Sequence, residues 1–228
     1  MSGKPTATVE DVSGGHGRPE LSVKRLLLVG TGSVSVSELP FWLGWLNVSY
    51  PELDVRVAIT RSAERFVTRS SLAARSNNDV FLDAWADEGV AEASHVELAD
   101  WAEAVVVYPA TLSFVSRLAL GAADSPVLLA CQCTQAPVVL APALPPGGVD
   151  SAAYKKHRAE LEARPNTAIV SPRAGMSLVE RKRTGAVPPP LLNVLQLTDT
   201  LYRDIGPGRA KSSLLEEIDD TMRDWILV

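Results

Sequence analysis

The chain has 228 residues, of which 46% are hydrophobic and 21% are charged, and its formal net charge at pH 7 is −5. This balance is typical of one folded domain, and it excludes the basic surface that nucleic-acid-binding proteins use. No apolar run is long enough to span a bilayer, and the N-terminus has no signal-peptide pattern, so we expect a cytoplasmic protein without a membrane partner.

The first part of the chain predicts a leader followed by a strand and a helix. Residues 1–22 are rich in glycine, serine, proline and charge, which favours a disordered leader ahead of a single domain at 23–228. Lys24–Gly30 is a continuous apolar run of the kind found in buried parallel strands. Ser35–Trp45 then predicts a helix, although Pro40 interrupts it.

A second strand and helix follow in the same order. Val55–Ile59 predicts a strand, Thr60-Arg61-Ser62 ends it, and Ala63–Arg69 predicts a helix. Two consecutive strand–helix units indicate an α/β fold, a Rossmann-like three-layer sandwich with a mostly parallel sheet.

The middle of the chain is less regular. Residues 70–94 are polar and predict a long connection, with a short strand or helix near 80–86. Val105–Tyr108 predicts the next strand, which we expect to break at Tyr108-Pro109, and Ser113–Leu120 predicts a helix closed by Gly121.

The last third alternates strands and helices and contains a basic loop. Residues 171–190 hold glycine, proline and four basic residues, and they predict a mobile loop that could contact substrate. The other expected elements are a helix over Pro126–Cys133, a strand over Pro137–Ala141, a helix over Ser151–Ala163, a strand over Thr167–Val170, and helices over Leu191–Asp204 and Ser212–Leu227.

Small and hydroxyl residues follow four of the predicted strands. Free N–H groups and hydroxyls beside helix N-termini form anion sites suited to phosphate, and ligands of open α/β sheets bind at this edge. Taken singly, such residues merely end strands. Together they favour a nucleotide pocket, and Gly30-Thr31-Gly32 is too short for the dinucleotide fingerprint, which leaves a mononucleotide such as FMN.

Among the three histidines, His95 is the candidate for proton transfer. It precedes the strand at Val105–Tyr108 and could reach the same sheet edge, although a surface histidine is the alternative. Cys131 and Cys133 lie in an apolar run without a nearby histidine, so we expect buried thiols and no metal site.

Several motifs occur in an order that resembles one family, the homo-oligomeric flavin-containing cysteine decarboxylases. The resemblance covers residues 24–204. The matching pieces are Gly32-Ser33, Thr60-Arg-Ser-Ala-Glu-Arg-Phe66, His95 with Leu98 and Trp101-Ala-Glu103, Pro109-Ala-Thr111, Gly121-Ala-Ala-Asp124 and Pro142-Ala143.

This resemblance implies an FMN cofactor and His95 as the catalytic base. The residues that the match places around the flavin and its phosphate are Gly32, Ser33, Thr60, Ser62, Phe66, Pro109, Ala110, Thr111 and Ser113. Those it places near the substrate are Pro142, Ala143, Leu144 and Pro145, to which the basic loop would add Arg173, Arg181, Lys182 and Arg183.

Three departures from the family pattern refine the expectation. Leu112-Ser113-Phe114 stands where the family has Ala-Asn-Thr, and Pro145 stands where it has the asparagine that grips a substrate carboxylate. The basic loop also lacks the reductant cysteine of the coenzyme A branch. The resemblance then implies that the enethiol is the product and that reduced flavin is reoxidised by oxygen.

These features point to the peptide-modifying branch of the family. The predicted reaction is oxidative decarboxylation of a C-terminal cysteine in a ribosomal precursor peptide, giving an enethiol for an aminovinyl-cysteine-type ring. The alternatives are a phosphopantothenoylcysteine decarboxylase, a flavin prenyltransferase and a non-catalytic flavin-binding subunit. The family also implies a homo-trimer or a multiple of trimers.

Overall fold

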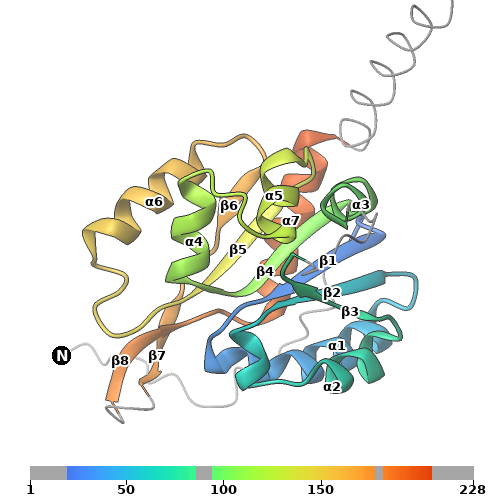
Figure 1. Ribbon diagram of the computed structural model, residues 1–228, viewed down its shortest axis with the longest axis horizontal. Helices are drawn as coiled ribbons and strands as arrows, with labels where there is room; N and C mark the ends of the chain where they lie inside the picture. Colours follow the sequence, from blue (N-terminus) through green and yellow to red (C-terminus); the bar gives the residue numbers. More distant parts are fainter. Residues whose placement is uncertain (1–19, 86–93, 178–181, 207–228) are drawn as a thin grey trace, which may run out of the picture.

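The computed structural model describes residues 20–85, 94–177 and 182–206, and within them the chain forms a three-layer α/β sandwich (Figure 1). Six parallel strands lie in the order β3-β2-β1-β4-β5-β6. The predicted fold class is therefore confirmed. The strands are β1 Arg25–Gly30, β2 Asp54–Thr60, β3 Val80–Asp83, β4 Ala104–Thr111, β5 Val138–Ala143 and β6 Thr167–Ile169.

Helices cover both faces of this sheet, and each face has its own apolar core. One layer consists of α1 Leu39–Ser49, α2 Arg69–Ser76 and α7 Leu191–Ile205. The other consists of α3 Ser94–Trp101, α4 Leu112–Ala119, α5 Pro126–Cys133 and α6 Ala152–Glu162. Because the central strands are buried on both faces, their sequences are continuous apolar runs and do not alternate between apolar and polar residues. None of the helices described is long and apolar enough to span a membrane.

The predicted helix over 63–69 is wrong. A 3-10 turn at Ala63–Arg65 comes first, and α2 starts only at Arg69. The Thr68 hydroxyl caps α2 by accepting a hydrogen bond from the Ser71 N–H, so part of the expected polar connection is helical. The helix expected over 35–45 likewise begins as a 3-10 turn at Val34–Glu38 and continues as α1 to Ser49.

The strand expected to break at Tyr108-Pro109 instead continues to Thr111. The Tyr108-Pro109 peptide bond is cis, and the ladder with β5 shifts register between Val107 and Ala110. Since proline has no N–H to donate, it is tolerated here, near the strand end where the ladder is irregular.

Residues 171–190, predicted as a loop, contain a β-hairpin. Its strands are β7 Arg173–Ser177 and β8 Lys182–Val187, which pair antiparallel. Gly175 faces Val187 so closely that an added Cβ would lie 2.3 Å from a Val187 methyl carbon. The mobility of this segment remains a prediction. The final helix expected over 212–227 lies outside the described residues.

Candidate active site

A cavity of about 510 Å³ opens at the carboxyl ends of β1, β4 and β5, where the hairpin forms its outer wall. Its described lining is mostly apolar and includes no charged side chain. Seven of the residues predicted for cofactor or substrate binding meet here: Gly32, Ser33, Thr111, Ser113, Ala143, Leu144 and Pro145.

The floor of the cavity is held by a residue that sequence reasoning missed, Thr31. Its buried hydroxyl donates to the Pro109 carbonyl at 2.7 Å and accepts from the Thr111 N–H at 2.9 Å. The Thr31 N–H also donates to the Pro109 carbonyl, at 3.3 Å. These bonds join the ends of β1 and β4. The only sequence signal for this role was a hydroxyl residue between two glycines at a strand end.

The loop after β2 packs directly against the loop after β1. An added Cβ on Gly32 would lie 2.4 Å from the Ser62 hydroxyl oxygen, so only glycine fits at this position without a shift of Ser62. The Thr60 and Ser62 hydroxyls are 3.0 Å apart. Thr60 and Ser62 do not line the cavity, but Ser62 supports the glycine that does.

The N-terminus of α4 points at the cavity. Thr111 is the N-cap, and its hydroxyl accepts a hydrogen bond from the Phe114 N–H at 3.4 Å. Ser113 lies in the first turn with an exposed side chain. A helix start beside the Gly32-Ser33 loop offers N–H groups and hydroxyls to an anion such as a phosphate.

The outer wall is an extension of the sheet. Leu144 and Ala186 exchange two backbone hydrogen bonds, at 2.9 and 3.1 Å, which attach β8 to the residue after β5. Pro145 and Pro146 follow on the rim with exposed side chains. The Pro145 carbonyl accepts the Gly148 N–H at 2.8 Å, which closes the turn on this rim.

Tyr108 adds a second attachment at the same end of the hairpin. It is buried, and its hydroxyl donates to the Pro189 carbonyl at 3.0 Å, just beyond β8. Burial raises the pKa of Tyr108 to about 12, while the positive charge of Arg173 acts in the opposite sense. The phenol therefore stays protonated at neutral pH and keeps its role as a donor.

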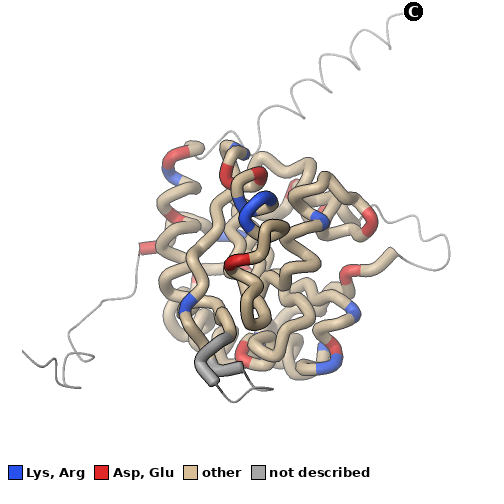
Figure 2. The backbone as a smooth tube through the Cα atoms, turned by 90° about the vertical axis from the view of Figure 1, so that its left-hand side faces the viewer, with Lys and Arg blue, Asp and Glu red and all other residues tan. Residues whose placement is uncertain are grey.

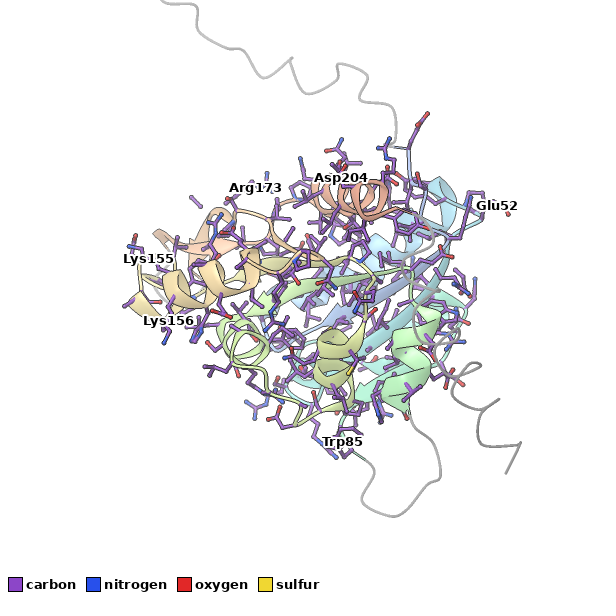
Figure 3. All side chains as sticks on the ribbon, turned by 90° about the horizontal axis from the view of Figure 1, so that it is seen from above. Glu52, Trp85, Lys155, Lys156, Arg173 and Asp204 are labelled. Carbon is purple, nitrogen blue, oxygen red and sulfur yellow. The ribbon has the colours of Figure 1, made fainter. Side chains whose placement is uncertain are left out.

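Other predicted binding residues lie outside the cavity. Pro109, Ala110 and Pro142 are buried within β4 and β5, and Phe66 is exposed after the 3-10 turn. Arg173 is exposed at the start of β7 (Figure 3). Lys182 and Arg183 belong to β8, and Arg181 lies outside the described residues.

His95 also lies away from the cavity in this chain. It occupies the first turn of α3, which packs against α5, and its ring meets Trp85 at a centroid distance of 5.6 Å. Figure 1 shows α3 and the hairpin at opposite ends of the sheet, and Figure 3 places Trp85 and Arg173 on opposite sides of the molecule. His95 is therefore not among the residues that line this cavity.

Within the part of the chain that the structure describes, charged and metal-ligating side chains form no second site. Figure 2 shows the side of the molecule that lies at the left in Figure 1, and acidic and basic residues are interspersed there. The described residues include no cluster of three or more histidine, cysteine, aspartate or glutamate side chains that could hold a metal ion. Cys131 is buried, which raises the pKa of its thiol to about 12, whereas Cys133 is exposed, contrary to the expectation that both are buried.

Comparison with known proteins matches this architecture to one family model. The model described as Flavoprotein matches residues 16–201. The structure resembles the crystal structure of the cypemycin decarboxylase CypD, with a TM-score of 0.68 and 32% identity over 82% of this chain and 97% of that one. The FMN-dependent cysteine decarboxylase TvaF from thioviridamide biosynthesis gives a TM-score of 0.63 and 27% identity, over 81% of this chain and 99% of that one.

Curated relatives match over shorter segments. The cypemycin cysteine dehydrogenase (decarboxylating) of a Streptomyces species is 41% identical over 115 residues, which is 50% of this chain and 60% of that protein. The bifunctional coenzyme A biosynthesis protein of Escherichia coli K12 is 34% identical over 158 residues, 68% of this chain and 37% of that protein. The matched segments thus span less than two thirds of these relatives.

Proposed function

This chain belongs to the flavoprotein family, and we propose that within it the chain is an FMN-dependent peptidyl-cysteine decarboxylase. The observation that carries the proposal is the cavity at the ends of β1, β4 and β5. It combines a glycine loop, a helix N-terminus and an apolar wall, in a fold shared with the cypemycin decarboxylase.

The residues of the cavity fit a flavin mononucleotide. The absence of a Cβ at Gly32 lets backbone approach a ligand closely, and the hydroxyls of Ser33 and Ser113, beside the N-terminus of α4, suit a phosphate. The apolar side chains of Leu112, Leu144 and Val187 suit a flat aromatic ring. When bound, FMN supplies a two-electron acceptor for oxidation of the cysteine side chain.

The chain's own residues then have three tasks. The apolar wall excludes water and holds the peptide segment next to the cysteine. His95 accepts the thiol proton. Since Pro145 has no N–H to offer, the basic residues of the hairpin, Arg173 among them, orient the carboxylate that leaves as CO2.

We further propose that a second copy of the chain completes the site. His95 lies on α3, whereas the cavity lies beside β8, and one chain does not bring them together. Exposed Phe41 and Val48 on α1 give an apolar surface suited to a subunit contact. A homo-trimer or a multiple of trimers is the assembly proposed, and light scattering at micromolar concentration tests it; a monomer would contradict the shared site.

The test of function is mass spectrometry of a peptide that ends in cysteine, incubated with FMN-loaded protein under air. A mass loss equal to CO2 plus two hydrogen atoms supports the proposal. A matched peptide ending in serine is the control and should stay unchanged, because its hydroxyl cannot form a thiocarbonyl.

Mass spectrometry with a second substrate separates the competing functions. Loss of CO2 alone from phosphopantothenoylcysteine would identify the coenzyme A branch, to which the Escherichia coli relative belongs. Flavin binding without any mass change would indicate a non-catalytic flavin-binding subunit.

A further inference from the structure

Three consecutive prolines, Pro188-Pro189-Pro190, connect the hairpin to α7. Proline has no N–H to donate and its ring fixes φ, so this segment is stiff and can be held by hydrogen bonds only through its carbonyl groups. The Pro190 carbonyl accepts the Asn193 N–H at 3.0 Å, in the first turn of α7. The Pro189 carbonyl accepts the Tyr108 hydroxyl, also at 3.0 Å. The segment is therefore attached both to α7 and to β4.

Tyr108 reaches this carbonyl from a central strand of the sheet. Its side chain is 1% exposed and belongs to the same apolar core as Leu191 and Val194 of α7. The Trp42 ring meets the Tyr108 ring edge to face, with centroids 6.4 Å apart. Packing thus fixes the position of the ring, and the hydroxyl extends from it to Pro189.

The proline segment leads directly into the wall of the cavity. Val187, two residues before Pro189, lines the cavity and pairs with Arg173 in the hairpin ladder. Its neighbour Ala186 exchanges two backbone hydrogen bonds with Leu144. Because the connection from Val187 to Pro189 is stiff, a displacement of Pro189 would move Val187 and, through the ladder, Arg173.

We propose that Tyr108 is a positioning residue for the peptide substrate: through the Pro189 carbonyl, its hydroxyl holds the hairpin wall in place against the cavity. Tyr108 does not itself line the cavity, so it acts through the hairpin. Loss of the hydroxyl should weaken peptide binding, because Arg173 is the residue proposed to orient the substrate carboxylate. This effect on the peptide rests on the proposed function, whereas the attachment of the hairpin does not.

Hydrogen exchange of the FMN-loaded protein without substrate tests the attachment. Tyr108→Phe keeps the ring and removes the hydroxyl. The Ala186 N–H, which donates to the Leu144 carbonyl at 3.1 Å, should then exchange about three- to tenfold faster, as expected from the loss of one buried hydrogen bond. The Val105 N–H, which donates to the Pro137 carbonyl at 2.8 Å near the other end of β4, should keep the parent rate.

Tyr154→Phe is the matched control. It removes a second buried tyrosine hydroxyl, one that has no hydrogen-bond partner among the described residues. Since no attachment of the hairpin is lost, exchange at Ala186 and the kinetics with a peptide should both stay at the parent values.

Kinetics with a peptide ending in cysteine test the role in substrate binding. Tyr108→Phe should raise KM about three- to tenfold, with kcat and FMN content little changed, because the glycine loop at Gly32 and the N-terminus of α4 do not belong to the hairpin. A merely structural role would not produce this separation of KM from kcat.

The outcomes can be told apart. If Ala186 exchanges at the parent rate in Tyr108→Phe, or if Val105 accelerates by the same factor, the proposal is overturned. Faster exchange at Ala186 with an unchanged KM overturns the role in peptide binding. If the parent protein modifies no peptide, the proposed function fails, and hydrogen exchange alone decides whether Tyr108 positions the hairpin wall.

Discussion

The hydroxyl of Thr31 accepts the Thr111 N–H at 2.9 Å, and the same hydroxyl donates to the Pro109 carbonyl at 2.7 Å. One buried side chain thereby sets the distance between the ends of β1 and β4. The lining residues Gly32 and Thr111 stand on either side of that junction.

Thr31→Val should therefore destabilise the protein and loosen the cavity. Loss of the hydroxyl leaves the Thr111 N–H without its acceptor, and such a loss costs about 1–3 kcal/mol in free energy of unfolding. Urea unfolding and FMN titration measure the two effects. Thr31→Ser, which keeps the hydroxyl, is the control and should stay close to the parent in both. If Thr31→Val binds FMN as tightly as the parent, the junction between β1 and β4 does not contribute to cofactor binding.

Gly32→Ala should lose FMN while keeping the fold. Its new Cβ would lie 2.4 Å from the Ser62 hydroxyl oxygen, so one of the two loops must move. Absorbance of the bound flavin after purification is the measurement. Gly44→Ala is the matched control, since its Cβ would meet only the end of the flexible Arg75 side chain at 3.0 Å. A yellow Gly32→Ala protein would mean that FMN binds elsewhere.

His95→Asn should retain FMN and lose decarboxylation. A positioned acid–base group contributes about 10²–10⁴-fold to a rate, and asparagine cannot exchange the proton. Turnover of a cysteine-terminated peptide measures the loss. His157→Asn on α6 is the control and should be active. Unchanged turnover in His95→Asn would make His95 a structural residue.

Replacing Arg173, Arg181, Lys182 and Arg183 together with alanine should weaken peptide binding and leave FMN content unchanged. Arginine offers a two-pronged donor for the carboxylate that Pro145 cannot bind. Isothermal titration with a substrate peptide measures the affinity. Lys155→Ala with Lys156→Ala on α6 removes charge elsewhere and should have little effect. Retained affinity in the fourfold variant would place the carboxylate at another site.

Asp83 should make stability depend on pH. Burial raises the pKa of its carboxyl above the usual 3.8, although the Val127 N–H and Ser125 hydroxyl oppose this. The folded state thus favours the protonated form. The contribution of Asp83 to the free energy of unfolding is complete below pH 3.8, the usual pKa of the carboxyl. It is lost as pH rises through the higher pKa of the folded state.

Asp83→Asn removes that titration. The free energy of unfolding of the parent minus that of Asp83→Asn should therefore fall as pH rises above 3.8, when both are measured by urea unfolding. Asp79→Asn, at an exposed position before β3, should show no such trend. A constant difference between the parent and Asp83→Asn would mean that folding does not change the pKa of Asp83.

The strands of the core, including the three-residue β6, could be predicted from sequence, but the weakly patterned helix α3 could not. Residues 25–30 and 138–143 are nearly continuous apolar runs, and both are buried strands. Helix α3 has eight residues and one buried leucine, so its local signal is too weak to separate it from a loop.

The hairpin was missed for a different reason. The sequences of β7 and β8 are rich in glycine and basic residues rather than alternating apolar ones. β8 also bridges to Leu144, which is distant in sequence. The separation of His95 from the cavity was likewise not predictable, since it depends on where α3 packs against α5.

Two attachments define which part of the hairpin can vary. Leu144 binds Ala186 through the backbone, and Tyr108 binds the Pro189 carbonyl, so the base of the hairpin is built into the sheet. Gly175 and Gly185 pair with each other, and neither of them belongs to the two attachments. If the hairpin orients the substrate as proposed, changes that leave these two attachments intact should alter peptide preference without rebuilding the sheet.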